Sequence, residues 1–377
     1  MSVYRQLGVK RVVNALGRMT LLGGSILPKE VLEAMMEANE CFVDMEELQN
    51  KAGDFIARLL GAEDALVTSG TFSALVLAAA ACMTGNDVEL MERIPFTEGM
   101  RNEILIQKGL RVKYDRAMSV AGARLLEVGD EKGITTVRHL EDAIGEKTAA
   151  IHFLAPGGRE GTVPLDEVLK IARKYNVPLI LDAAGQTFPP ENMRKYVATG
   201  ADLVCFGAKY FDGPNSAGIL CGRRDLVEAA KLQTFICFES RAIRALGRGM
   251  KLDRQEIVAT VVALERWMKM DHRDRFKVQH ERIKRISEGL KGIDGLKVTP
   301  AGERMGFFTG AAISFDGKIL GITAKDVAGL LKAGDPSIWV RSSEEAIYIN
   351  ADTLVAGDED RIVEALKGIL SKRKKPL

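Results

Sequence analysis

Three short segments of the chain carry residue types that could do chemistry together. Ser69–Thr71 reads Ser-Gly-Thr and joins an apolar run to a helical run. The backbone N–H groups and hydroxyls of such a turn suit a phosphate at the start of a helix. Asp182 directly follows three apolar residues, where a carboxylate is partly desolvated and needs a cationic or protonated partner. Lys209 follows another apolar run, whose surroundings can lower the pKa of its amine and make it a nucleophile.

Each segment also has an ordinary structural interpretation. Ser and Thr are preferred N-caps, an Asp can cap the turn that follows it, and a single lysine is most often a surface residue. The order and spacing of the segments favour chemistry, because Lys209 lies 27 residues after Asp182 and the turn precedes both. A pyridoxal 5'-phosphate (PLP) enzyme of the large aminotransferase fold needs this order. Its turn holds the phosphate, its Asp pairs with the pyridinium nitrogen, and its Lys forms a Schiff base with the aldehyde.

The elements that position these segments alternate along the chain. From about residue 60, short apolar runs alternate with amphipathic stretches, which predicts βαβ units around a mostly parallel sheet. The clearest unit has a helix at 165–175 and buried strands at 179–181 and 202–206. A strand at 218–220 is expected to be antiparallel or at an edge. Because ligands bind at the carboxyl ends of the strands in such sheets, we expect the three segments to meet there.

The pattern changes after about residue 250. Long charged helices at 254–268 and 274–290 are followed by short strands, which predicts an α+β arrangement. We therefore expect a large domain at 51–250 that holds the site and a small C-terminal α+β domain at 251–377. Residues 1–50 are too few for a third core and are expected to pack across the other two domains.

The composition excludes several classes of protein. Lys plus Arg number 53 and Asp plus Glu 51, so the net charge of +2 provides no broad surface for nucleic acid or anionic membranes. The basic run Lys372–Lys375 is interpreted as a solvated helix end. Five scattered cysteines without a CxxC pair, the absence of a signal peptide, and no apolar stretch longer than Ala74–Met83 predict a soluble cytoplasmic protein.

Other catalytic patterns are missing from the sequence. It has no GxGxxG, no GxxxxGK[ST] and no GxSxG, which argues against a dinucleotide fold, a P-loop and a hydrolase elbow. The histidines lack metal-ligand spacing, so we predict no metal site. The loop Gly157–Gly161 is interpreted as a turn at the border of the active-site mouth.

Over nearly its whole length the chain resembles the selenocysteine-synthase-like (SelA-like) branch of the fold-type I PLP-dependent enzymes. Within that branch it is more similar to the D-glucosaminate-6-phosphate ammonia-lyase-like group. The resemblance is carried by VNALGRMTLLGGSILPKEVLEAM, FVDMEELQNKAGDFIARLLGAEDALVTSGTFSAL, SVAGARLLEVGDEKG, LILDAAGQTFPPENMRKYVATGADLVCFGAKYFDGPNSAGILCGRRDL and GRGMKLDRQEIVATVVALERW. It implies an α/β fold like that of aspartate aminotransferase, with PLP as cofactor. Ser69, Gly70 and Thr71 would hold the phosphate, Asp182 the ring nitrogen and Lys209 the aldehyde carbon.

The resemblance also implies roles for residues outside the three segments. Gln186 would contact the ring hydroxyl, and Arg248 would reach a phosphate, in its own or the neighbouring subunit. Arg341, at the end of the strand SIWVR, either clamps a substrate carboxylate with its planar fork or is a surface arginine. The lyase-like relatives are expected to have a ring-stacking His where this chain has Leu110, so Arg111 is the candidate for that role. The segment FGAKYFDGPN also departs from the FSGGKxxxGPQ pattern of those relatives, which leaves the substrate open.

The activity implied is that of a PLP-dependent lyase acting on a hydroxylated amino acid or amino sugar acid. Lys209 would remove the α-proton, water would leave from the β-carbon, and ammonia and a 2-keto acid would be released. Racemase, epimerase and aldolase reactions use the same residues and stay open. A tRNA-dependent selenium transferase is disfavoured by the charge of +2 and by a chain that starts almost at VNALG. The fold implies at least a homodimer, with a small-molecule substrate and no membrane partner.

Overall fold

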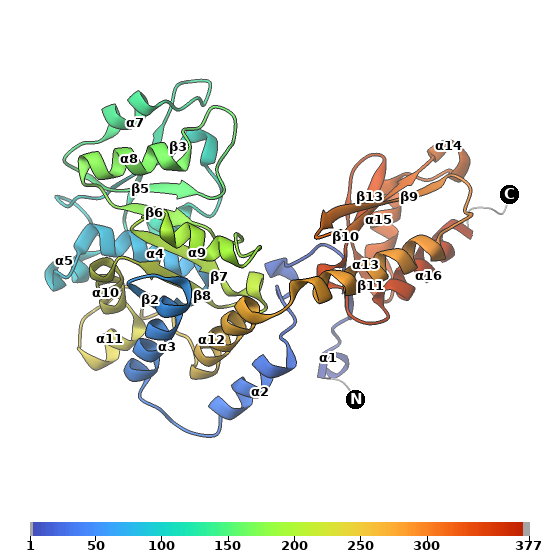
Figure 1. Ribbon diagram of the computed structural model, residues 1–377, viewed down its shortest axis with the longest axis horizontal. Coiled ribbons are helices and arrows are strands. Elements are labelled where there is room, and N and C mark those ends of the chain that lie inside the picture. The colour runs from blue at the N-terminus through green and yellow to red at the C-terminus, as the bar shows by residue number, and fades with distance from the viewer. Residues whose placement is uncertain (1–2, 372–377) are drawn as a thin grey trace. The chain divides into compact units, whose positions relative to one another are not determined.

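The computed structural model describes residues 3–371 and divides the chain into two compact units (Figure 1). Residues 27–269 form the larger unit, and residues up to 26 together with those from 270 onward form the smaller one. The boundaries expected from the sequence, after residues 50 and 250, differ from these. The basic run Lys372–Lys375 lies outside the described residues.

Helix α12 (Arg254–Lys269) accounts for the later boundary between the units. Its buried side chains include Ile257, Leu264 and Trp267, and it packs against α2 (Lys29–Ala38) and α3 (Met45–Leu60). The larger unit therefore extends to the end of this helix. The first fifty residues are divided between the units, because β1 (Val12–Asn14) pairs with β11 (Ser337–Trp339) in the smaller one.

A seven-stranded sheet forms the centre of the larger unit (Figure 1). Its strands, in spatial order, are β2 (Asp64–Thr68), β8 (Gly218–Gly222), β7 (Leu203–Gly207), β6 (Leu179–Asp182), β5 (Thr148–Leu154), β3 (Glu103–Gln107) and β4 (Arg124–Val128). Only β8 runs against the other strands, since it pairs antiparallel with both β2 and β7. All residues of β2, β6, β7 and β8 are buried, as expected for strands covered on both faces.

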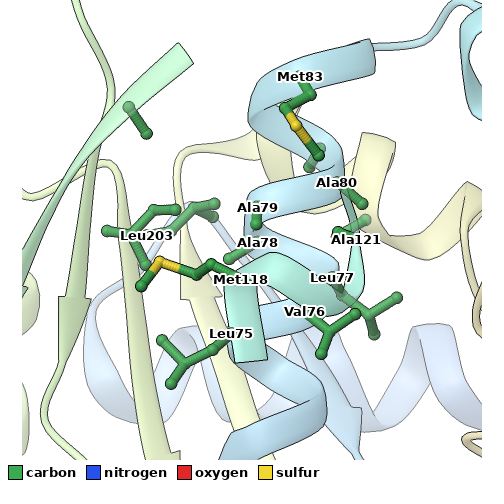
Figure 2. Close-up of a cluster of buried hydrophobic side chains, with 14 of the residues drawn as sticks. Leu75, Val76, Leu77, Ala78, Ala79, Ala80, Met83, Met118, Ala121 and Leu203 are labelled. Atoms are coloured by element: carbon green, nitrogen blue, oxygen red, sulfur yellow. The ribbon is translucent and has the colours of Figure 1, made fainter. Parts of the chain in front are cut away.

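Helix α4 (Gly70–Thr84) covers one face of this sheet. Ser73–Ala81 is buried on every side of the helix, because the sheet lies on one side and α6 (Arg116–Val120) and α10 (Arg224–Leu232) pack on the others. Figure 2 shows its alanines and Leu75 next to Leu203 of β7, with Met118 of α6 and Ala121, the residue that follows α6, nearby. The small side chains allow the helix to lie close to the strands, so the N-terminus of α4 is fixed at the carboxyl edge of the sheet.

The remaining helices of the larger unit lie between its strands, except α11, which follows the last of them. They are α5 (Val88–Arg93), α7 (Val137–Ala143), α8 (Leu165–Tyr175), α9 (Glu191–Ala198) and α11 (Phe235–Ser240), with short 3-10 turns η2 (Lys108–Leu110) and η3 (Ala208–Phe211). Helix α8 has the length expected from its amphipathic pattern, with its apolar side chains buried. The predicted α/β class with a mostly parallel sheet is therefore confirmed.

The smaller unit has a four-stranded antiparallel sheet with the order β12 (Arg341–Ser342), β13 (Ala346–Asn350), β10 (Phe307–Phe315) and β9 (Leu296–Arg304). Helix α13 (His272–Gly289) packs on β10, α15 (Ala324–Ala333) packs on β13, and α16 (Asp358–Ser371) packs against both helices. The short elements are α1 (Val3–Gln6), η1 (Thr20–Leu22), α14 (Gly317–Leu320) and η4 (Ala351–Thr353). An α+β C-terminal part agrees with the sequence expectation, although β9 and β10 are longer than expected.

Among residues 3–371, no helix has the length and apolar character that a membrane span requires.

Candidate active site

The Ser-Gly-Thr segment forms the turn between β2 and α4. Ser69 is the N-cap residue of α4, but its side chain accepts no hydrogen bond from the first turn of the helix. Its hydroxyl donates instead to Ser73 Oγ at 2.9 Å, and Thr68 Oγ1 donates to the carbonyl of Gly70 at 3.0 Å. Ser69 and Thr71 are half-buried. The N–H groups at the start of α4 are thus not capped by Ser69 and stay available to an anion.

Two glycines allow this turn to approach β8 and the end of β7, the strand that precedes Lys209. A Cβ atom on Gly218 would lie 2.7 Å from the Gly70 carbonyl carbon and 2.8 Å from the Thr71 nitrogen. A Cβ atom on Gly207 would lie 3.0 Å from Thr71 Oγ1. Since Thr68 and Gly207 both pair with Gly218, the ends of β2 and β7 lie at the same edge of the sheet.

Asp182 is the last residue of β6 and pairs with Cys205 of β7. Only 4% of its surface is exposed. Its Oδ1 accepts a hydrogen bond from the backbone nitrogen of Ala184 at 3.1 Å. Burial raises the pKa of this carboxyl group, and the hydrogen bond from Ala184 offsets part of that shift. Such a group is suited to pair with a protonated ring nitrogen, which would favour its ionised form.

Lys209 lies in η3, two residues after the end of β7. It is half-buried, and burial lowers the pKa of its amine. Its Nζ lies 5.0 Å from the centroid of the Tyr210 ring, within the range of a cation–π contact. The same ring lies 3.6 Å from the position that a Cβ of Gly185 would take, so the loops after β6 and β7 are in contact.

Helix α12 supports the loop that carries Lys209. The Trp267 indole nitrogen donates to the carbonyl of Thr187 at 2.8 Å, and Thr187 Oγ1 donates to the carbonyl of Tyr210 at 2.9 Å. Arg266 Nη1 lies 3.3 Å from the Asp212 carboxylate. These residues were missed in the sequence analysis. A tryptophan within a charged helix was the one available signal, and its partner lies 80 residues away.

Arg111, the candidate ring-stacking residue, lies beyond β3. Its Nε is 2.6 Å from Asp115 Oδ2, its Nη2 is 3.2 Å from Asp115 Oδ1, and its Nη1 also pairs with Glu127 of β4. The ion pair with Asp115 raises the pKa of the guanidinium. The neighbouring Leu110 is fully buried. β5 separates β3 from β6, and a stacking role for Arg111 stays a prediction.

The other predicted residues lie in three different places. Gln186 is half-buried in the loop after Asp182, where its backbone nitrogen donates to the carbonyl of Ala183. Arg248 lies beside α11, with its Nε 2.7 Å from Glu239 Oε1. Arg341 is exposed at the start of β12 in the smaller unit, not at the end of the strand Ser337–Trp339 as the sequence indicated. The structure thus brings Gln186 to the edge that holds Asp182, and the roles of all three residues stay predictions.

The described residues match the functional groups of PLP. A phosphate needs N–H donors, and the start of α4 offers them beside two hydroxyl side chains. A pyridine nitrogen needs a buried acid, and an aldehyde needs an amine of lowered pKa. No cluster of three metal-ligating side chains occurs in the part of the chain that the structure describes. This fold, with these groups at its carboxyl edge, defines the class of fold-type I PLP-dependent enzymes.

Comparisons with known proteins place the chain within this class. It belongs to the SelA family, whose model, described as L-seryl-tRNA selenium transferase, matches residues 12–349. It is 31% identical over 379 residues to D-glucosaminate-6-phosphate ammonia lyase of Salmonella typhimurium, covering 98% of each chain. It is also 32% identical over 380 residues to 5'-C-glycyluridine monooxygenase-decarboxylase of a Streptomyces species, covering 97% of this chain and 92% of the relative.

A solved structure described as D-glucosaminate-6-phosphate ammonia-lyase covers both chains in full with a TM-score of 0.89 at 29% identity. The predicted family and the predicted fold type are therefore confirmed. The SelA family and its fold neighbours are PLP-dependent, and the expectation of an enzyme related to the ammonia-lyases is confirmed as well.

Proposed function

We propose that this protein is a PLP-dependent lyase that converts a hydroxylated amino acid or amino sugar acid into a 2-keto acid and ammonia. The observation that carries the proposal is a buried acid, Asp182, and a half-buried lysine, Lys209, at neighbouring strand ends beside the Ser69–Thr71 turn. The Salmonella typhimurium relative is named for ammonia release from D-glucosaminate 6-phosphate, which supports a substrate of that chemical class.

The groups at the carboxyl edge would divide the binding of PLP among them. The N–H groups and hydroxyls of Ser69–Thr71 would hold the phosphate. Arg248, which lies beside α11, would reach a phosphate in its own or the neighbouring subunit. Gln186 would donate to the ring hydroxyl. Asp182 would keep a proton on the ring nitrogen, because an ionised carboxylate in a buried place stabilises a neighbouring cation. Lys209 would bond the aldehyde carbon.

PLP supplies an electron sink that stabilises negative charge at the substrate α-carbon. The chain's part in the reaction is to move protons. Lys209, displaced by the substrate amine, would accept the α-proton on Nζ. Because burial lowers its pKa, a larger fraction of this amine is uncharged near neutral pH, and only the uncharged amine accepts a proton.

The same proton serves the next step. Lys209 would return it to the β-hydroxyl as the C–O bond breaks, so that a water molecule leaves. Hydrolysis of the C–N bond then consumes one water molecule and releases ammonia. The balance is one amino acid converted into one 2-keto acid and one ammonia, without an oxidant or reductant. Arg341 would hold the substrate carboxylate, since its planar fork binds a carboxylate bidentately.

We further propose a homodimer or larger homo-oligomer in the cytoplasm. The free cysteines among the described residues, three of them buried, suit a reducing compartment. Sedimentation of the active protein as a dimer would support this assembly, and full activity of a monomer would contradict it.

The function is tested by incubating purified protein with D-glucosaminate 6-phosphate and other β-hydroxy amino acids, and by measuring ammonia and 2-keto acid. We expect both products in equal amounts, their loss in Lys209→Ala, and wild-type rates in Lys113→Ala, which changes an exposed lysine. Exchange of the α-proton without keto acid would indicate an epimerase, and aldehyde release an aldolase. Uptake of oxygen with release of carbon dioxide would indicate chemistry like that named for the Streptomyces relative. Each of these results would overturn the lyase proposal.

A further inference from the structure

A histidine whose ring has no hydrogen-bond partner among the described residues lies in the central sheet. His152 belongs to β5, and only 1% of its surface is exposed. Both ring nitrogens, Nδ1 and Nε2, are buried, and neither has a hydrogen-bond partner among residues 3–371. Burial lowers the pKa of this imidazole to about 4, so the ring is neutral at physiological pH. A neutral imidazole has one N–H donor and one acceptor, and buried polar groups are normally paired.

The strand register places His152 on the same face of the sheet as Asp182. β5 and β6 are parallel neighbours, with His152 opposite Ile180 and Leu154 opposite Asp182. Side chains two residues apart on a strand share a face, so Asp182 lies one step further toward the carboxyl edge than His152. Ile180 belongs to the buried cluster around α4, which identifies this face as the one that α4 covers. His152 is therefore behind Asp182, seen from the edge where the site opens.

The other charged neighbours of His152 already have partners. The electrostatic contributions to its pKa come from Asp115 and Arg111. The carboxylate of Asp115 accepts from Arg111 Nε at 2.6 Å, from Arg111 Nη2 at 3.2 Å and from the Val112 nitrogen at 3.0 Å. In the described part of the chain, the Asp182 carboxylate accepts a single hydrogen bond, from the Ala184 nitrogen. Asp182 is thus the acid on this face with more capacity to accept a further donor.

We propose that His152 is a positioning residue for Asp182: when a cationic ring nitrogen ionises Asp182, the neutral imidazole donates its N–H to that carboxylate. The inference rests on the proposed PLP site. An ionised carboxylate in a buried place needs more than one donor, and charge-assisted hydrogen bonds are the stronger ones. His152 then holds Asp182 toward the ring nitrogen, and the ring nitrogen of the histidine that carries the proton gains a partner.

Substitution of His152 is expected to weaken the binding of PLP. Replacing His152 by Phe keeps a planar ring and removes the donor. We expect the dissociation constant for PLP to rise roughly ten- to hundredfold, the range for a hydrogen bond to a charged group. The same substitution is expected to leave the affinity for 1-deazapyridoxal 5'-phosphate unchanged, because that analogue has no ring nitrogen and does not ionise Asp182. In an Asp182→Asn background, His152→Phe is expected to have no further effect.

A measurement on the wild-type chain keeps the test independent of how the variants fold. Protein labelled with 15N at histidine is observed by NMR before and after PLP is added, with Phe variants of the other three histidines used for assignment. We expect the His152 N–H proton to move strongly downfield on PLP binding and to stay in place with the deaza analogue.

Three results would overturn the inference. The first is an equal shift of the His152 N–H proton signal with PLP and with the deaza analogue. The second is no shift of that signal while PLP is bonded to Lys209. The third is a shift of that signal in Asp115→Asn and none on the addition of PLP. If PLP does not bind at Lys209, the proposed function is refuted as well. If PLP binds there and one of these three results is found, only the role of His152 is refuted.

Discussion

The approach of the Ser69–Thr71 turn to β8 gives a quantitative prediction for Gly218→Ala. A Cβ atom at this position would lie 2.7 Å from the Gly70 carbonyl carbon, 2.8 Å from the Thr71 nitrogen and 2.9 Å from the Phe206 carbonyl oxygen. All three are backbone atoms, so no side-chain rotation relieves the overlap. The turn has to move away from the strand, and with it the N–H groups proposed to hold the phosphate.

The expected size of the effect follows from these distances. Overpacking in a close contact costs about 1–3 kcal/mol, and each 1.4 kcal/mol corresponds to a tenfold change in affinity, so the PLP dissociation constant should rise roughly ten- to hundredfold. Gly207→Ala should raise the PLP dissociation constant less than Gly218→Ala does. Its new Cβ meets two side-chain atoms, Thr71 Oγ1 at 3.0 Å and Tyr210 Cδ2 at 3.1 Å, and both can shift.

The assay is a PLP titration followed by absorbance, with Gly145→Ala as the matched control. A Cβ at Gly145 meets no heavy atom within 4 Å, so this variant should bind PLP like the wild type. We expect the lowest affinity for PLP in Gly218→Ala, a higher affinity in Gly207→Ala and the highest in the control. Wild-type affinity in a folded Gly218→Ala variant would refute the assignment of the turn as the phosphate site.

Five further predictions concern four side chains. Asp182→Asn should lower the turnover number at least a hundredfold; wild-type turnover would contradict its role. Because burial raises the pKa of Asp182, the PLP-free chain loses stability as pH rises through that pKa, so PLP-free Asp182→Asn should melt higher than wild type at pH 7. Trp267→Phe removes the donor to the Thr187 carbonyl and should cost about 1–2 kcal/mol in urea unfolding, whereas an unchanged midpoint would show that α12 does not support the loop. The pKa of His152 falls from 6.5 to about 4 on folding, so stability should decrease by about 3 kcal/mol as pH falls from about 6.5 to 4. That decrease in stability should be smaller in His152→Phe, and an equal decrease in the variant would show that His152 does not cause it. Arg341→Ala should raise KM for the substrate at least tenfold without changing PLP affinity; an unchanged KM would leave Arg341 a surface residue.

Much of the large unit could be predicted from local patterns. The helix Leu165–Tyr175 has a clear apolar stripe, and Leu179–Asp182 is a run of apolar residues that ends in a polar one, as buried parallel strands do. A strand at 218–220, antiparallel or at an edge, was expected, and β8 is antiparallel to both of its neighbours. These elements are sufficient to place Asp182 and Lys209 at one edge.

What escaped prediction depends on contacts between distant parts of the chain. The fit of Gly218 against Gly70 involves residues 148 positions apart, and no local pattern signals it. The larger unit ends at residue 269 and not at the expected 250, because the apolar side chains of the charged helix α12 pack on α2 and α3. Strand β9 of the long hairpin β9–β10 is largely exposed, and β10 is mostly half-buried, so the hairpin lacks the clear apolar alternation by which strands are recognised.

The central claim is that Lys209 is the residue bonded to PLP, and borohydride reduction tests it most directly. Purified protein is incubated with PLP, reduced, digested and mapped by mass spectrometry. We expect one modified peptide, containing Lys209, and none in Lys209→Ala. A modified peptide that lacks Lys209 would contradict the assignment of the whole site.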